Sequence, residues 1–191
     1  MYATSAPRSG MDVDDTIAAV EEATTTERGR IGSDKALIAA TGANLAADAV
    51  WAAAATRESG LADALEGWAG DADSEPVAET FDRARAAASE RAARVDAQPG
   101  DPDALSTHLD TVGGTPERVG AGLVAPALVL DRFYLQVISF FVNEADEGSA
   151  DVARQLRSGA SDLDPARDAL GVLDESGRER ARDAAVEAVG V

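Results

Sequence analysis

Apolar positions recur along most of the chain at the three- and four-residue spacing of an amphipathic helix. The spacing first appears over residues 13–20, behind Asp12 as a helix cap. It returns in a short segment that opens at Ser33 and stops at Gly42. Patterns that alternate with the period of a strand are nearly absent, so the sequence predicts an all-α protein.

The same spacing predicts three long helices. They run from Leu45 behind the cap Asn44 to about Ala69, from Ser74 or Asp73 to about Ala97, and from Pro126 or Asp131 to about Ser158. Between the second and the third, residues 101–125 form a crossover. It contains two short helices, each of which starts with a cap residue followed by proline.

The end of the chain adds a fourth principal helix after Asp164 and Pro165, and a last helix to about Val189. Ser176 and Glu179 form a capping box for this last helix. Four principal helices with one long crossover are the connectivity of a ferritin-like four-helix bundle. We therefore predict such a bundle with extra short helices at the N- and C-termini. Residues 1–11 are expected to be a flexible arm, and residues 12–191 a single helical-bundle domain.

Residue types that are scarce exclude several kinds of chemistry. The chain has no cysteine, which excludes disulfides, thiolate metal sites and cysteine nucleophiles. Its only histidine is His108, so one chain cannot build a metal site from several histidines. A lone histidine on the crossover is typical of a structural residue. Aromatic residues are only 4% of the chain, which favours thin helices that approach closely.

The net charge is the strongest compositional signal. Asp and Glu number 35 against 17 Lys and Arg, which gives a net charge of −18, and Lys35 is the only lysine. In ordinary buffer such a surface repels itself, whereas at 1 M salt the Debye length falls to about 3 Å. The composition predicts a halophilic protein. A nucleic-acid mimic or a sink for a basic partner is the alternative, but the acids are scattered rather than gathered in a block. A nucleic-acid partner is disfavoured by the sign of the charge.

Location and assembly follow from the apolar segments. Residues 1–10 hold one arginine and no apolar run, so they lack the parts of a secretory signal. Pro126 and the pair at 131–132 interrupt the most apolar stretch, which leaves fewer than about 20 consecutive apolar residues. We expect a cytoplasmic location and no membrane partner. The segment Phe133–Val142 is apolar on nearly every side, which predicts cover by a second subunit in a homodimer.

One charged residue breaks the inward stripe of the first long helix. Glu58 lies four residues after Ala54 and three before Leu61. A buried carboxylate is costly unless it is paired or bound to a metal. Three interpretations are open at this point: Glu58 pairs inside the bundle, with Arg91 as the candidate partner, it ligates a metal, or the assumed phase of the helix is wrong.

Three segments resemble a haloarchaeal group of rubrerythrin-like proteins of the ferritin superfamily. They are Arg-Val-Gly-Ala-Gly-Leu-Val at 118–124, the pair Asp131–Arg132, and Phe-Phe-Val-Asn-Glu-Ala-Asp-Glu at 140–147. The resemblance extends over roughly residues 31–190. Some proteins of this group are labelled transcription antitermination proteins, so the resemblance also points to a transcription-related role.

The resemblance implies a degenerate di-iron site. The family's terminal glutamates would fall on Glu58 and Glu144, but its Glu-x-x-His pair would fall on Ala88 and Arg91. We therefore expect no metal, no cofactor and no catalytic residue, and hypothesise that Arg91 replaces the metal charge by holding Glu58, Glu144 or both. The expected function is a non-enzymatic bundle that acts on an unknown protein partner. The alternatives are a metal-binding or oxidative-stress protein with an incomplete site, and a transcription-related factor.

Overall fold

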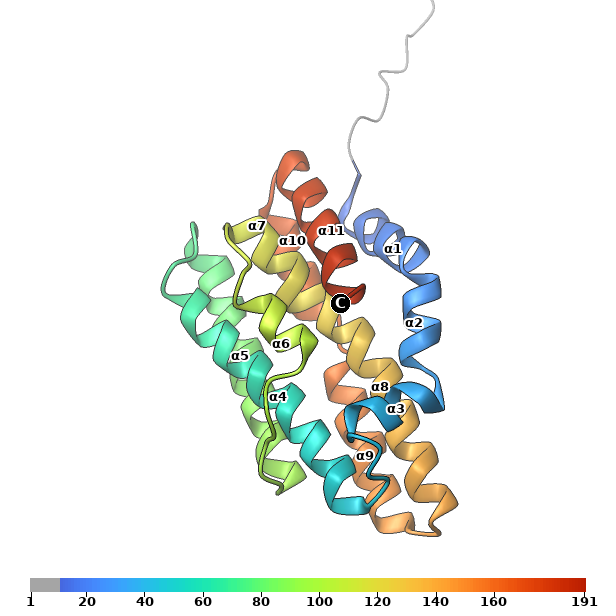
Figure 1. Cartoon of the computed structure of the whole chain (residues 1–191). Coiled ribbons are helices and arrows are strands. Elements are labelled where there is room, and N and C mark those ends of the chain that lie inside the picture. Colours follow the sequence, from blue (N-terminus) through green and yellow to red (C-terminus); the bar gives the residue numbers. More distant parts are fainter. Residues whose placement is uncertain (1–10) are drawn as a thin grey trace, which may run out of the picture.

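The computed structural model describes residues 11–191, and all regular structure in this part of the chain is helical (Figure 1). The all-α prediction is confirmed. The expected N-terminal arm lies outside the described residues, except for Met11. The elements are α1 (Val13–Ala23), α2 (Thr25–Ile31), α3 (Asp34–Ala40), α4 (Ala47–Ala69), α5 (Glu75–Val95), α6 (Ala104–Leu109), α7 (Thr115–Val119), the π-helix η1 (Gly120–Val124), α8 (Ala125–Asn143), α9 (Glu147–Ala160), α10 (Asp164–Val172) and α11 (Glu175–Val189).

Two pairs of long helices form the body of the protein. Helix α4 packs along α5, and α8 packs along α9; both pairs run in the same general direction across Figure 1. The crossover with α6, α7 and η1 links the first pair to the second. Helix α10 packs on α5, whereas α11 covers α7 and η1 and is itself covered by α1. Helices from both halves of the chain therefore surround η1 and the start of α8, where every residue is buried.

Local capping explains the first helices. The carboxylate of Asp12 accepts a hydrogen bond from the backbone N–H of Asp15 at 2.8 Å, as the sequence predicts. After α3, Gly42 has a φ of +58°, the left-handed conformation that glycine adopts at helix ends. Thr24 separates α1 from α2, and its hydroxyl donates a hydrogen bond to the carbonyl of Val20 at 2.7 Å.

Two predicted caps are wrong. The N-cap position of α4 is Ala46, which makes no side-chain cap, and not Asn44, because Asn44 still belongs to the turn that ends α3. Helix α11 is capped by Asp174, which accepts from the N–H of Gly177 at 2.7 Å. Ser176 consequently lies inside the helix, and the predicted capping box does not form.

The predicted third long helix is interrupted near its middle. Ala145 has a φ of +57°, and the N–H of Asp146 donates to the carbonyl of Phe141 at 2.9 Å, which closes a Schellman motif. Asp146 then caps α9 by accepting from the N–H of Ser149 at 3.0 Å. Glycine is the usual residue at such a left-handed position, so the alanine at 145 gives no local signal that the helix ends here. The chain turns back here, and α9 becomes the partner of α8.

Every residue from Gly120 to Leu130 is buried, and the two glycines of η1 allow close helix contacts. A Cβ atom at Gly120 would lie 1.8 Å from the backbone carbonyl oxygen of Ala181 in α11. A Cβ atom at Gly122 would lie 2.3 Å from the indole ring of Trp68. The Gly-x-Gly pair is therefore a packing feature that lets α11 and Trp68 approach the π-helix.

We expect Gly120→Ala to destabilise the fold. The obstructing atom is backbone, so α11 would have to move, and overpacking of this kind costs about 1–3 kcal/mol. The matched control is Gly67→Ala in α4, where nothing lies within 4 Å of the added methyl group; it should be neutral or stabilising by up to about 1 kcal/mol. Urea unfolding of both variants in molar KCl measures the difference. Equal stability of the two variants would contradict the packing role of Gly120.

The continuous helix from Thr115 to Asn143 is long and apolar enough to cross a membrane by length and composition. Of its most apolar window, 61% is buried inside the protein. Core helices of soluble proteins pass the same test, so this is weak support for a membrane span. The expectation that the chain has no membrane partner stays a prediction.

Candidate functional site

The candidate site is centred on Glu58, which lies on the inward face of α4 with 0% of its surface exposed. Ala54, one turn earlier, and Leu61, one turn later, are buried on the same face. The predicted helix phase is therefore confirmed. A carboxylate in this position loses its hydration and must be compensated by neighbouring groups.

Arg91 of α5 supplies the compensating charge. Both its Nε and its Nη2 lie 2.9 Å from the Oε2 atom of Glu58, and only 13% of the arginine side chain is exposed. The predicted pairing of Glu58 with Arg91 is confirmed. Ala88, one turn earlier on α5, is completely buried and presents only a methyl group. A short alanine at this position is consistent with the close approach of α5 to α4.

Tyr134 of α8 is the second partner of Glu58, a contact that the sequence analysis did not predict. Its hydroxyl donates a hydrogen bond to the Oε1 atom of Glu58 at 2.8 Å, and its side chain is completely buried. A signal was available, because a buried tyrosine normally finds a partner for its hydroxyl group. Glu58, Arg91 and Tyr134, which we call the Glu58 cluster, join three helices.

Burial governs the electrostatics of the Glu58 cluster. It raises the pKa of Glu58 above the ordinary value, and the charge of Arg91 and the hydrogen bond from Tyr134 oppose that rise. The pKa of Tyr134 lies well above its usual value, first because of burial and then because of the negative charge of Glu58. Tyr134 is therefore held as a protonated donor. Both carboxylate oxygens of Glu58 have a donor, so the cluster is internally satisfied.

Glu144 does not join this cluster. It is the C-cap residue of α8 and is exposed on the turn between α8 and α9. The role of a second inward glutamate, which the resemblance implies for Glu144, is wrong because α8 ends at Asn143 and Glu144 lies beyond its last turn. Arg91 therefore forms its ion pair with Glu58 and not with Glu144.

A second cation, Arg57, lies beside the Glu58 cluster with 17% of its side chain exposed, and the sequence analysis did not predict it. Arg57 places its Nε 3.3 Å from the Oδ2 atom of Asp103, and its guanidinium lies 4.2 Å from the ring centroid of Phe133. Burial lowers the pKa of Arg57, and the charge of Asp103 opposes that shift. Asp103 also caps α6, accepting from the N–H of Ser106 at 2.9 Å. This pair fastens the crossover to α4.

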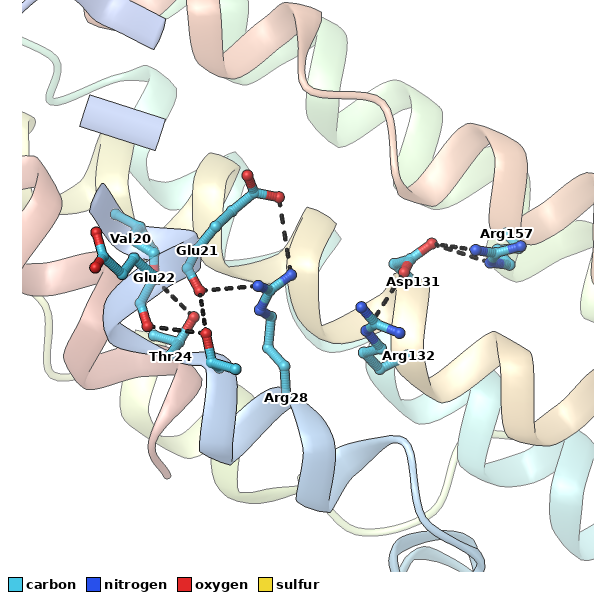
Figure 2. A network of polar contacts seen from close by, with 9 residues as sticks. Val20, Glu21, Glu22, Thr24, Arg28, Asp131, Arg132 and Arg157 are labelled. Carbon is cyan, nitrogen blue, oxygen red and sulfur yellow. Dashed lines mark hydrogen bonds and ion pairs between the residues drawn. The ribbon is translucent and has the colours of Figure 1, made fainter. Parts of the chain in front are cut away.

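The pair Asp131–Arg132, part of the resemblance, belongs to another polar network (Figure 2). Asp131 of α8 accepts from Arg157 of α9 at 2.9 Å, and the Nε of Arg132 lies 3.8 Å from Asp131. On the other side, Arg28 of α2 donates to the carbonyl of Glu21 at 2.8 Å. Asp131 therefore ties α8 to α9, and Arg28 fastens the corner between α1 and α2.

The arrangement of acids and histidine bears on metal binding. Among residues 11–191, no three Asp, Glu or His side chains are grouped so that they could hold a metal ion together. A cavity of about 80 Å³ adjoins Arg91, and its wall includes Leu61, Leu65 and Leu123. Within the described chain, the Glu58 cluster is thus an ion pair and hydrogen bond in largely apolar surroundings.

Comparisons with protein-family models, curated proteins and solved structures found no match. The resemblance to rubrerythrin-like proteins therefore stays a prediction from the sequence.

Proposed function

We propose that this is a non-enzymatic helical-bundle protein that works through contacts with other protein molecules in a cytoplasm of high salt concentration. The observation that carries the proposal is that the polar groups of the Glu58 cluster bond to one another. The only fully buried carboxylate among the described residues already has donors on both oxygens, one of them a permanent cation. A group engaged in this way positions helices and is not free to act on a substrate.

The order of the helices supports a ferritin-like four-helix bundle built from α4, α5, α8 and α9. The fourth long helix is then α9, and not the predicted helix after Asp164 and Pro165, which is the short α10. The connection between α5 and α8 is then the single long crossover of that architecture. In such a bundle Arg91 would stand where a metal ligand is expected. Arginine stays protonated and does not ligate metals, but it supplies positive charge to a buried carboxylate. This interpretation makes the Glu58 cluster the electrostatic replacement of a lost metal site.

Metal content tests the proposal. We expect the protein, purified from cells supplied with iron, manganese and zinc, to retain far less than one metal ion per chain after dialysis in molar KCl. The comparison variant is Ala88→Glu combined with Arg91→His, which restores two side chains of ligand type on α5 at i, i+3 spacing. A stoichiometric metal in the unaltered protein that is lost on Glu58→Gln would contradict the proposal and favour the metal-binding alternative.

A further inference from the structure

The outer side of α8 carries a groove with exposed apolar side chains. The groove, which we call the α3–α8 groove, has a volume of about 290 Å³ and lies between α3, the turn before α4, and α8. Its apolar lining is Leu37, Ile38, Leu45 and Phe140. Ile38 is 38% exposed and Leu45 is 49% exposed, among the most exposed large apolar residues of the described chain.

The wall that α8 contributes to this groove has no charge. From Phe133 to Asn143 the helix contains no Asp, Glu, Lys or Arg, although these make up 27% of the whole chain. The polar groups on this wall are the neutral side chains of Gln136, Ser139 and Asn143. Depletion of charge at the centre of a surface patch is the compositional mark of a protein interface. On a chain of net charge −18, a wall without charged groups adds no repulsion of its own between two molecules.

The rim of the groove carries both signs of charge. Asp34 lines the groove, and Lys35, the only lysine of the chain, is exposed beside it. Lys35 lies three residues before Ile38 on α3, so the two side chains are neighbours on the helix surface. In the described chain, Lys35 forms no ion pair within 4 Å. A twofold arrangement can place the lysine of each copy against an acid of the other.

We propose that the α3–α8 groove is the contact surface of a symmetric dimer, and that its occupant is a second copy of this chain. The inference rests on the proposed function and names its partner. The sequence predicted that the whole segment Phe133–Val142 is covered by a second subunit. Phe133 and Phe141 are only 3% and 1% exposed and belong to the core, so they cannot form this contact. Phe140 is the aromatic residue of α8 that faces the groove.

Light scattering and sedimentation velocity of the full chain in 3 M KCl test this dimer. We expect a mass of twice 19.6 kDa at micromolar concentration. Leu45→Asp should weaken the dimer roughly tenfold or more, because it places a carboxylate in the apolar contact. The matched control is Val172→Asp on α10, where the original side chain is 46% exposed; its dissociation constant should change less than about twofold. Circular dichroism checks that both variants fold.

Two results would overturn the dimer: a folded monomer of 19.6 kDa at high concentration in 3 M KCl, or a dimer that Leu45→Asp and Val172→Asp weaken equally. A metal-free chain that stays monomeric overturns only the identity of the partner. Stoichiometric metal in the Glu58 cluster instead overturns the proposed function. The two failures are therefore distinguishable by mass and by metal content.

Discussion

Arg91→Ala should destabilise the protein by about 3 kcal/mol at neutral pH, the cost of breaking a buried ion pair. The substitution leaves Glu58 with 0% exposure and with Tyr134 as its remaining partner. Urea unfolding in molar KCl measures the loss. The matched control is Arg85→Ala on the same helix, because Arg85 is 37% exposed and pairs at 3.7 Å with the exposed Asp82. Exposed pairs contribute about 0–1 kcal/mol, so this control should change stability little.

The loss caused by Arg91→Ala should depend on pH. Burial raises the pKa of Glu58 from its ordinary value of 4.5, and Arg91 opposes the rise, so the pKa is higher still in the variant. Below pH 4.5 the carboxyl group is neutral in the folded variant, and little charge is stranded. As the pH rises through the folded-state pKa, the ionised form becomes costly and stability falls. The difference from the unaltered protein should therefore be small in acid and grow toward neutral pH; a constant difference would contradict this account.

A double variant separates stranded charge from lost packing. Glu58→Gln combined with Arg91→Met removes both charges but retains an oxygen that can accept from Tyr134. Replacing a buried ion pair by neutral groups of similar volume is often close to neutral in stability. We expect the double variant to recover most of the stability lost in Arg91→Ala. A double variant as unstable as the single one would show that the arginine acts through its volume.

The second large effect is expected from salt. Lowering the salt concentration below roughly 0.5 M, where the Debye length exceeds about 4 Å, should cost most of the helical circular dichroism signal. The described ion pairs are mostly exposed and each contributes little stability, so they do not compensate for the self-repulsion of a chain with a net charge of −18. A scan of far-UV circular dichroism and melting temperature from 3 M to 20 mM KCl measures the transition.

If salt stabilises the fold by screening charge, ionic strength should matter and the identity of the salt should not. NaCl and KCl at equal ionic strength should preserve the fold equally, whereas an uncharged osmolyte in dilute buffer should not replace them. An unchanged spectrum and melting temperature down to 20 mM would contradict the halophilic interpretation. Rescue by sucrose alone would show that surface exclusion of the solute, and not screening, stabilises the fold.

The sequence by itself determined the helical class and much of the first half of the fold. Apolar spacing places Glu58 on the inward face of α4 because a regular helix keeps its phase over several turns. The same reasoning identifies Arg91 as its partner, and Asp12 caps α1 as predicted. These features depend on interactions within one helix or on the faces of two uninterrupted helices. Local patterns therefore suffice to predict them.

Tertiary structure decided the remaining features. The chain turns at Ala145 in a left-handed conformation that alanine seldom adopts, so no local signal separated α8 from α9 or placed Glu144 on an exposed turn. Tyr134 reaches Glu58 only because α8 crosses the first pair of helices at that level. Gly120 accommodates the backbone of Ala181 in α11, 61 residues farther along the chain. Contacts between distant segments depend on how the helices cross, and the pattern of apolar residues along the chain does not determine the crossing.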